Sequence, residues 1–349
     1  MPFEPDYRHM LAVLRNQRPA RLPLYEHHIS PLVMEQILGR RFAALQAGDD
    51  RDLDEFYRHF CHFFAQMTYD TVSCEVGLAP LLPDHGAIMG GRPGPIKNRD
   101  DFARYPWAEI PDRYWRTADR HFTALARHLP PGMKALGGVG YGVFEVSEDL
   151  VGFEHLAYMQ ADDPALFADL YVQIGDLMAG IWATFLARYG EAFAICRMGD
   201  DLGFKTSTLI APRTIRQHIL PQYRRIIGQI KAAGKPFLWH SCGCIFSIME
   251  DVIALGIDAK HSNEDVIAPF ERWIELYGDR LGLLGGMDVD LLCQRTPAEV
   301  YDIVLEKGRR FRSLARGYAL GSGNSIPDYV PADGYLAMLA AAQKIRETE

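Results

Sequence analysis

The sequence lacks any concentration of positive charge. Its 349 residues hold 37 Lys and Arg against 45 Asp and Glu, which gives a formal net charge of −8 and a pI near 5.9. The densest basic stretches, residues 223–235 and 306–317, read as the solvated faces of helices. Nucleic-acid binding depends on clustered Lys and Arg that displace counterions from phosphates. The composition therefore argues against a nucleic-acid partner.

Long apolar runs are also missing, and cysteines are few. No stretch reaches the roughly 18 consecutive apolar residues of a membrane span. The first 28 residues show no charged head followed by an apolar core, the pattern of an export signal. Without such a signal, the six cysteines do not predict a disulfide framework. We therefore expect a cytoplasmic protein with no membrane partner.

What the sequence does contain is a regular alternation of strand-like and helix-like stretches. Amphipathic segments such as residues 211–234 and 296–313 separate eight apolar runs that end in Gly, Pro or polar residues. The runs are RLPLYEHH, DTVSCEVG, KALGGVGYG, FAICRMGDDLG, KPFLWHSCG, IDAKHSNED, LGLLGGMDVD and RGYALGSGNSIP. This order predicts an α/β fold, a single (β/α)8 TIM barrel over residues 1–349. Residues 80–110, rich in Gly and Pro, should form an extended loop after the second strand.

Polar residues stand at the ends of these runs, where a parallel barrel gathers its active site. The set comprises Glu26, His28, Cys74, Glu75, Tyr141, Asp200, Asp201, His240, Cys242, His261, Glu264, Asp288 and Asn324. We predict Glu75, Asp200, Asp288 and Asn324 as catalytic groups. Glu26, His28 and Tyr141 are predicted to bind a small-molecule substrate.

Several of these predictions have a simpler alternative. Capping of the following helix would explain Asp200, Asp201 and Asp288, because an Asp side chain satisfies free amides at a helix start. Surface exposure would explain Glu26 and Glu75. Adjacent strand residues face opposite ways, so at most one of His27 and His28 should point into the barrel.

Three stretches together resemble the uroporphyrinogen decarboxylase superfamily, and in particular its methyltransferase branch, the methylcobalamin:coenzyme M methyltransferases. They are GDDLGFKTSTLIAPRTIRQHILPQYRRIIGQIKAAGKPFLWHSCG, GGMDVDLL and GSGNSIPDYVPADGY. Decarboxylases of the superfamily carry an arginine segment like RQAGRY and an FSD motif, where this chain has LYEHHISP and VSCEVG. A substrate with many carboxylates would therefore lack its bidentate partners. The resemblance thus favours the methyltransferase branch.

The methyltransferase branch carries a His-x-Cys pair after its fifth strand, and this chain has His240-Ser241-Cys242 there. Side chains two residues apart on a strand end point the same way, so both can reach one metal. Zinc suits an imidazole with a thiolate and keeps a position open at catalytic sites. The resemblance therefore implies a zinc site that holds a thiol substrate as thiolate.

The third zinc ligand departs from the family pattern. Family methyltransferases have a cysteine after the eighth strand, where this chain has Asn324. An amide oxygen is a poor zinc ligand beside sulfur and imidazole. The end of the sixth strand offers His261 and Glu264, and we predict His261 as the ligand, with Glu264 orienting a ligand histidine.

The resemblance implies a zinc-dependent methyltransferase that moves a methyl group between a small substrate or thiol and a corrinoid protein. The cofactors would be zinc and a corrinoid carried by that partner. A decarboxylase or lyase of a small acid, other than uroporphyrinogen, is the alternative on the same barrel. A barrel that binds a corrinoid or porphyrin-like ligand without turnover is a third possibility.

Overall fold

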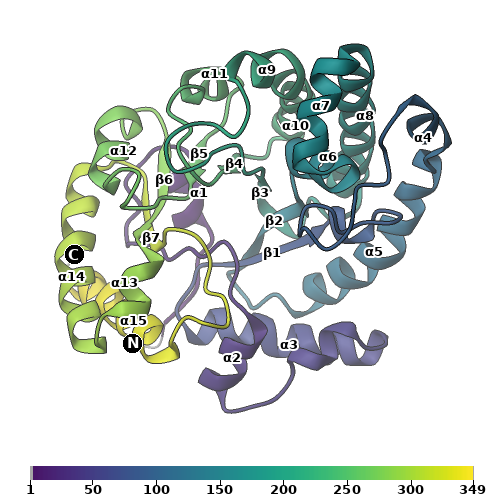
Figure 1. The fold of residues 1–349 in the computed structure, drawn as a ribbon. Coiled ribbons are helices and arrows are strands. Elements are labelled where there is room, and N and C mark those ends of the chain that lie inside the picture. Colours follow the sequence, from purple (N-terminus) through teal and green to yellow (C-terminus); the bar gives the residue numbers. More distant parts are fainter. Residues whose placement is uncertain (1–2, 349) are drawn as a thin grey trace.

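A computed structural model of the protein describes residues 3–348. Its centre is a curled sheet of seven parallel strands, in which strands consecutive in the chain pair with each other (Figure 1). The strands are β1 (Thr71–Gly77), β2 (Lys134–Gly140), β3 (Phe193–Gly199), β4 (Phe237–His240), β5 (Ala259–His261), β6 (Gly282–Met287) and β7 (Tyr318–Ser322). Each strand coincides with one of the predicted apolar runs, so the α/β class and the order of the strands are confirmed.

Helices surround this sheet on its outer side (Figure 1). The α-helices are α1 (Arg8–Leu14), α2 (Pro31–Leu38), α3 (Asp50–Gln66), α4 (Arg99–Arg104), α5 (Ile110–His128), α6 (Val143–Val151), α7 (Phe153–Asp162), α8 (Pro164–Tyr189), α9 (Pro212–Thr214), α10 (Leu220–Ala232), α11 (Met249–Ile253), α12 (Phe270–Tyr277), α13 (Val289–Gln294), α14 (Pro297–Leu314) and α15 (Ala332–Glu347). Short turns are 3-10 in η1 (Ala43–Ala47), η2 (Ala79–Leu81) and η3 (Trp107–Glu109), and π-helical in η4 (Ile215–Ile219).

Local sequence signals explain where the long helices begin. Asp49 accepts from the backbone amides of Arg51 and Asp52 and starts α3, while the side chain of Asp52 accepts from the amide of Asp49 in return. The same reciprocal pattern joins Thr296 and Glu299 at the start of α14. Such capping boxes satisfy amides that have no partner within the helix. The helix starts are therefore encoded locally.

The first predicted run, RLPLYEHH, is not a strand in the structure. It lies beside β7, where the amide of Tyr25 donates to Leu320 at 2.9 Å and the amide of Leu320 donates to Pro23 at 3.0 Å. Toward β1 a side chain supplies a hydrogen bond, from Ser73 Oγ to the Glu26 carbonyl at 2.5 Å. Pro23 has no amide hydrogen to give to a ladder. The segment is therefore held on one side by a backbone bridge and on the other by a side chain.

The interior of the curled sheet is filled by one apolar cluster. Tyr25 and inward-facing residues of β2 to β7 form it, and α1 closes the end opposite the strand C-termini, packing against β6 and β7. The sheet residues of the cluster are Leu136, Ala194, Ile195, Leu238, Ala259, Leu284 and Ala319. This filling leaves the C-terminal strand ends as the place where polar side chains can meet.

Two further segments bear on the predictions. Residues 82–98 form the part of the predicted loop that has no helix or strand, and they pack on α6, where Asp149 accepts from the amides of Gly86 and Ile88. Among the described residues, α8 is long and apolar enough to cross a membrane by length and composition, which the sequence did not lead us to expect. However, 56% of its most apolar window is buried, and it packs against α10. This is the pattern of a core helix.

Candidate metal centre

Two histidines end the neighbouring strands β4 and β5. His240 and His261 lie side by side in the sheet, with their Nδ1 atoms 2.8 Å apart. His261 Nε2 also lies 3.0 Å from the carbonyl oxygen of Ser322. A carbonyl can only accept, so His261 carries its proton on Nε2 and accepts at Nδ1. His240 therefore donates from Nδ1, and its Nε2 keeps a free lone pair.

The thiol of Cys242 lies against this free nitrogen. Its Sγ is 3.4 Å from His240 Nε2, and two donors point at the sulfur, Ser262 Oγ at 3.6 Å and Asn324 Nδ2 at 3.3 Å. A sulfur surrounded by donors is suited to negative charge. Burial raises the pKa of the thiol, and the neighbouring Asp201 raises it further. A thiolate at this position therefore needs a positive partner.

Asp201, which follows β3, completes the group. Its Oδ1 accepts from the amide of Cys242 at 2.9 Å and lies 3.7 Å from His240 Nε2. Ligand atoms around a tetrahedral zinc, at bond lengths of about 2.0–2.3 Å, stand about 3.5 Å apart. The distances of 3.4 Å from Cys242 Sγ to His240 Nε2 and 3.7 Å from that nitrogen to Asp201 are close to this spacing. The three side chains therefore fit a zinc ion with a fourth position open.

A second group of possible ligands fits less well. Nitrogens of His27, His240 and His261 also lie within 4.8 Å of one another. However, His27 stacks on His240, with ring centroids 3.8 Å apart and planes 26° from parallel. Lone pairs lie in the plane of each ring, so those of stacked rings do not converge on one ion. His27 therefore packs beside the group of Asp201, His240 and Cys242 and is not one of its possible ligands.

The comparison with protein families assigns the chain to a family. Residues 93–345 match the model of the family described as uroporphyrinogen decarboxylase. The chain belongs to this family. Its resemblance to the methyltransferase branch, predicted from the sequence, is confirmed.

Two known methyltransferases are similar to this chain, one in sequence and one in fold. The chain is 28% identical over 160 residues to a methylated-thiol:coenzyme M methyltransferase of Methanosarcina mazei, a match that covers 46% of this chain and 41% of that protein. A solved structure of a methyltransferase from Methanosarcina mazei matches with a TM-score of 0.72 over 98% of this chain and 99% of that chain, at 16% identity. The second likeness shows a shared fold.

One charged residue near the strand ends was not among the predicted site residues. Arg197 of β3 is 1% exposed, and its guanidinium donates to Glu75 Oε2 at 2.6 Å, to Tyr25 Oη at 3.1 Å and to the carbonyl of His27 at 2.9 Å. Glu75, predicted as catalytic, is therefore the partner of a buried cation. The signal was present in the sequence, because Arg197 is the one charge in the apolar strand FAICRMG.

The residues of the first run take different positions from one another. Glu26, predicted to bind substrate, is fully buried and accepts from the amide of Ser322 at 2.8 Å and from its hydroxyl. Burial raises the pKa of Glu26 to about 8, although both bonds act in the opposite direction. His28, also predicted, is exposed, and His27 is the histidine that faces His240.

Two of the predicted catalytic aspartates bind helix starts. Asp200 accepts from the amides of Phe144 and Glu145, both at 2.9 Å, at the beginning of α6. Burial raises the pKa of Asp200 to about 7. Asp288 accepts from the amide of Asp290 at 2.9 Å and starts α13. Asp288 therefore caps the helix that follows it, as the capping alternative predicted. Asp200 instead caps α6, a helix that precedes it in the chain.

Of the remaining predicted residues, three line one cavity. A cavity of about 250 Å³ is lined by Asn324, Glu264 and Asp288, among others. Tyr141 is half-buried at the end of β2 with a φ of 68°, and its ring occupies the space beside Gly77. Asn324 turns its nitrogen, not its oxygen, to the Cys242 sulfur.

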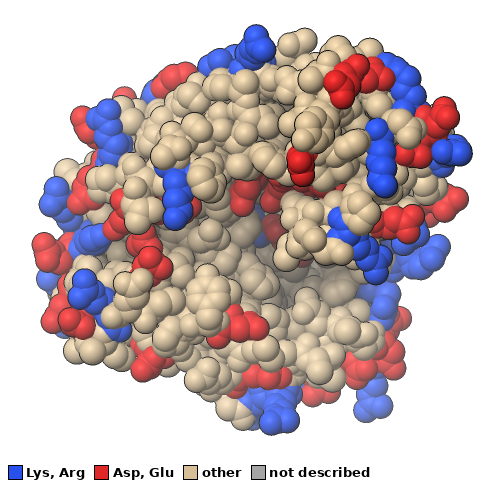
Figure 2. Space-filling model, viewed as in Figure 1, with Lys and Arg blue, Asp and Glu red and all other residues tan. Residues whose placement is uncertain are grey.

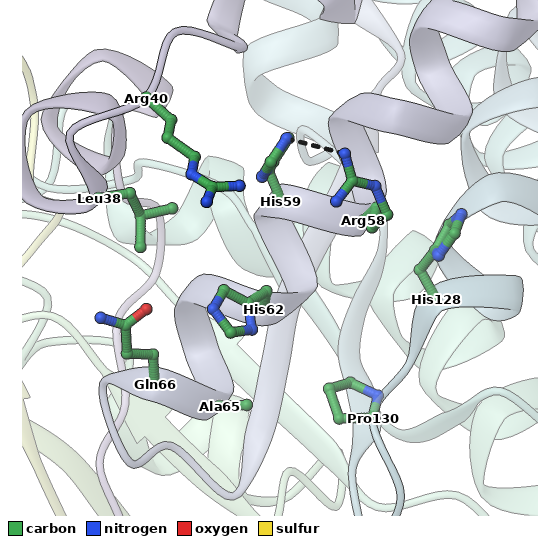
Figure 3. Close-up of a pocket in the computed structure, with 9 residues that line it drawn as sticks. All are labelled: Leu38, Arg40, Arg58, His59, His62, Ala65, Gln66, His128 and Pro130. Atoms are coloured by element: carbon green, nitrogen blue, oxygen red, sulfur yellow. Dashed lines mark hydrogen bonds between the residues drawn. The ribbon is translucent and has the colours of Figure 1, made fainter.

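A larger cavity of about 570 Å³ lies away from these strand ends, between α3 and the end of α5 (Figure 3). Arginines and histidines line it, including Arg58, His59 and His128. Carboxylates lie beside three of them, since Glu55 is 3.3 Å from Arg58 and 3.7 Å from His59, and Asp54 is 3.1 Å from His128. These three side chains therefore already have an acidic neighbour.

Proposed function

We propose that this protein is a zinc-dependent methyltransferase that moves a methyl group between a small substrate or thiol and a corrinoid protein. The observation that carries the proposal is the convergence of Asp201, His240 and Cys242 at the strand ends, at distances that suit tetrahedral zinc. Zinc at this position would bind a thiol or other small substrate at its open site and favour the substrate's deprotonated form.

Asp201 offers an answer to the missing family cysteine. With Cys242 as thiolate and Asp201 as carboxylate, the protein supplies two negative charges to a divalent ion, as two thiolates would. Asn324 then donates to the sulfur instead of binding the metal. We therefore propose Asp201 as the third ligand in preference to His261, whose two nitrogens are engaged with His240 and Ser322.

His261 has a supporting role in this proposal. Because it accepts the Nδ1 proton of His240, it fixes the tautomer that leaves His240 Nε2 free for the metal. Burial lowers the pKa of His261 to about 3, so its ring is a neutral acceptor at physiological pH. Ser322 in turn holds His261 through its carbonyl.

The charge around the site favours methyl transfer over the decarboxylation of a polyacid. Asp and Glu side chains are visible in the hollow at the centre of this face (Figure 2). Glu148 of α6 is one acid near the metal group; burial, followed by the nearby Asp200 and Asp201, raises its pKa to about 8. A substrate with several carboxylates would meet like charges here.

Exposed apolar side chains support a protein partner. Loops that follow strands β3, β5 and β7 expose Phe204 (58%), Val266 (73%) and Tyr329 (73%). Apolar residues exposed together at a rim mark contact surfaces. We propose that the corrinoid protein docks at this rim, that residues 22–29 complete an eight-stranded barrel in one domain, and that the protein works in the cytoplasm.

Elemental analysis tests the metal site. Purified wild-type protein should hold about one zinc per chain, and the Cys242→Ser and His240→Gln variants should lose it, because the remaining ligands cannot hold the ion alone. In the cobalt-substituted wild-type protein, an added thiol should produce a new sulfur-to-metal charge-transfer band. Unchanged zinc in the Cys242→Ser variant would contradict the site, and a response to carboxylates or alcohols instead of thiols would contradict thiol activation.

A further inference from the structure

Ser262, directly after β5, has an unusual backbone. Five described residues other than glycine have a positive φ, and four of them lie between 49° and 68°, near the left-handed helical region. Ser262 has a φ of 123°, outside that region and in conformational space that glycine adopts readily. A serine persists at such a position only when its surroundings hold it there.

Hydrogen bonds on both sides of Ser262 hold this backbone. The carbonyl of His261 accepts from Ser241 at 3.2 Å, and the amide of Asn263 donates to Gly323 at 2.9 Å. The Asn263 side chain in turn accepts from the amide of Gly286 at 2.9 Å. The peptide is therefore tied to β4, to the loop after β7 and to β6.

A buried lysine holds the carbonyl group of Ser262 itself. Lys260 is 3% exposed, and its ammonium group donates to the Ser262 carbonyl oxygen. The same Nζ lies 3.7 Å from the ring centroid of Trp273, which keeps the side chain in one position. The strained conformation is thus fixed from several directions.

We propose that Ser262 is a positioning residue for the Cys242 sulfur. At its positive φ, Ser262 Oγ reaches Cys242 Sγ at 3.6 Å and donates a hydrogen bond to it. Glycine would relieve the strain at this position but would remove the donor. This inference rests on the proposed metal site, and it adds that the strain is kept so that the hydroxyl can withdraw electron density from the ligand sulfur.

Three variants separate the hydroxyl from the strain. Ser262→Gly removes both, Ser262→Ala removes the hydroxyl alone, and Ser262→Thr keeps the hydroxyl while adding a branched side chain. At an ordinary position alanine is more stable than glycine. Here the glycine variant should melt above the alanine variant, by roughly 1–4 °C, because glycine adopts this φ without strain and alanine does not.

The sulfur-to-cobalt charge-transfer band of the substituted protein reports on the hydrogen bond. Losing a donor raises the energy of the sulfur electrons, so the band should move to longer wavelength in the glycine and alanine variants, and zinc affinity should fall about 10- to 100-fold. The threonine variant should melt below wild type yet keep the wild-type band. If Ser262 had only a structural role, the wavelength of the band would instead change with the melting temperature across the three variants.

The outcomes separate this inference from the proposed function. Wild-type protein that takes up no cobalt would overturn the metal site and the inference with it. If the charge-transfer band keeps its wild-type wavelength in both the glycine and the alanine variants, the role of Ser262 alone would be overturned. An alanine variant that melts above the glycine variant would show that the backbone is not strained and would overturn the inference as well.

Discussion

Replacing Asp201 by asparagine should remove the metal and leave the fold nearly intact. The amide oxygen of asparagine can still accept from the backbone of Cys242, as Asp201 Oδ1 does at 2.9 Å. It is neutral, however, and a poor zinc ligand beside sulfur and imidazole. Changes outside the ligand shell already weaken metal binding about 10- to 100-fold. Loss of a charged ligand should therefore weaken zinc binding by more than about 100-fold.

The effect of this change on stability should be small. A hydrogen bond to a charged acceptor contributes about 1.5–3 kcal/mol and one to a neutral acceptor about 0.5–1.5 kcal/mol, so the substitution should cost about 1 kcal/mol. The Asp201 side chain is 42% exposed, which places the cost at the lower end. For a chain of this size, the melting temperature should fall by about 1–2 °C.

The neighbouring Asp200 provides a matched control. It is fully buried, and its two oxygens accept from the amides of Phe144 and Glu145, so the NH2 group of asparagine would face a donor. An unsatisfied buried donor costs about 1–3 kcal/mol. Asp200→Asn should therefore lower the melting temperature by about 2–4 °C and keep the metal.

Two measurements on both variants decide which aspartate is the zinc ligand. Chelator competition gives the zinc affinity, and calorimetry gives the melting temperature. The expected result is opposite behaviour in adjacent residues: Asp201→Asn loses zinc and Asp200→Asn loses stability. Wild-type zinc affinity in Asp201→Asn would refute the assignment of the third ligand. Equal loss of zinc in both variants would show that the loop after β3 acts only through its conformation.

Two further predictions concern buried charge. Burial raises the pKa of Glu26 to about 8 in the folded protein, against 4.5 for an unperturbed group, so folding binds a proton between these values and stability should fall as the pH rises from about 4.5 to 8. In the Glu26→Gln variant, this loss of unfolding free energy between about pH 4.5 and 8 should be smaller by a few kcal/mol, as measured by urea unfolding at several pH values. An equal dependence on pH in both proteins would contradict the prediction. Arg197→Met should lower the free energy of unfolding by about 3 kcal/mol, because Glu75 loses its partner. Adding Glu75→Gln should restore part of that loss, and no recovery in the double variant would mean that the pair is not coupled.

Sequence reasoning located the strands and the His-x-Cys pair because both depend on local pattern. Apolar runs that end in turn residues define β1 to β7, and the spacing of His240 and Cys242 on a strand end directs both side chains to one side. It did not separate Asp200 from Asp201, because the direction of each side chain after a strand depends on the loop that follows. The same limit applies to His27 and His28.

Other features depend on contacts between distant segments. The tautomer of His240 follows from Ser322, which lies on another strand, and the backbone of Ser262 follows from bonds to three neighbouring segments. Pro23 could have warned that the first run would pair poorly, and the lone charge in FAICRMG could have drawn attention to Arg197.

The bridge between Leu24 and Leu320 has a consequence for the synthesis of the chain. The segment that lies beside β7 leaves the ribosome long before its partner strand, because β1 to β6 lie between them in the chain. Helix α1, which also packs against β6 and β7, waits as long. Contacts between such distant residues form slowly, because the entropy of closing the loop comes before the gain from pairing. The interior cluster therefore stays open at one seam until β7 has left the ribosome, and a chain that stops before β7 would expose the cluster to chaperones and proteases.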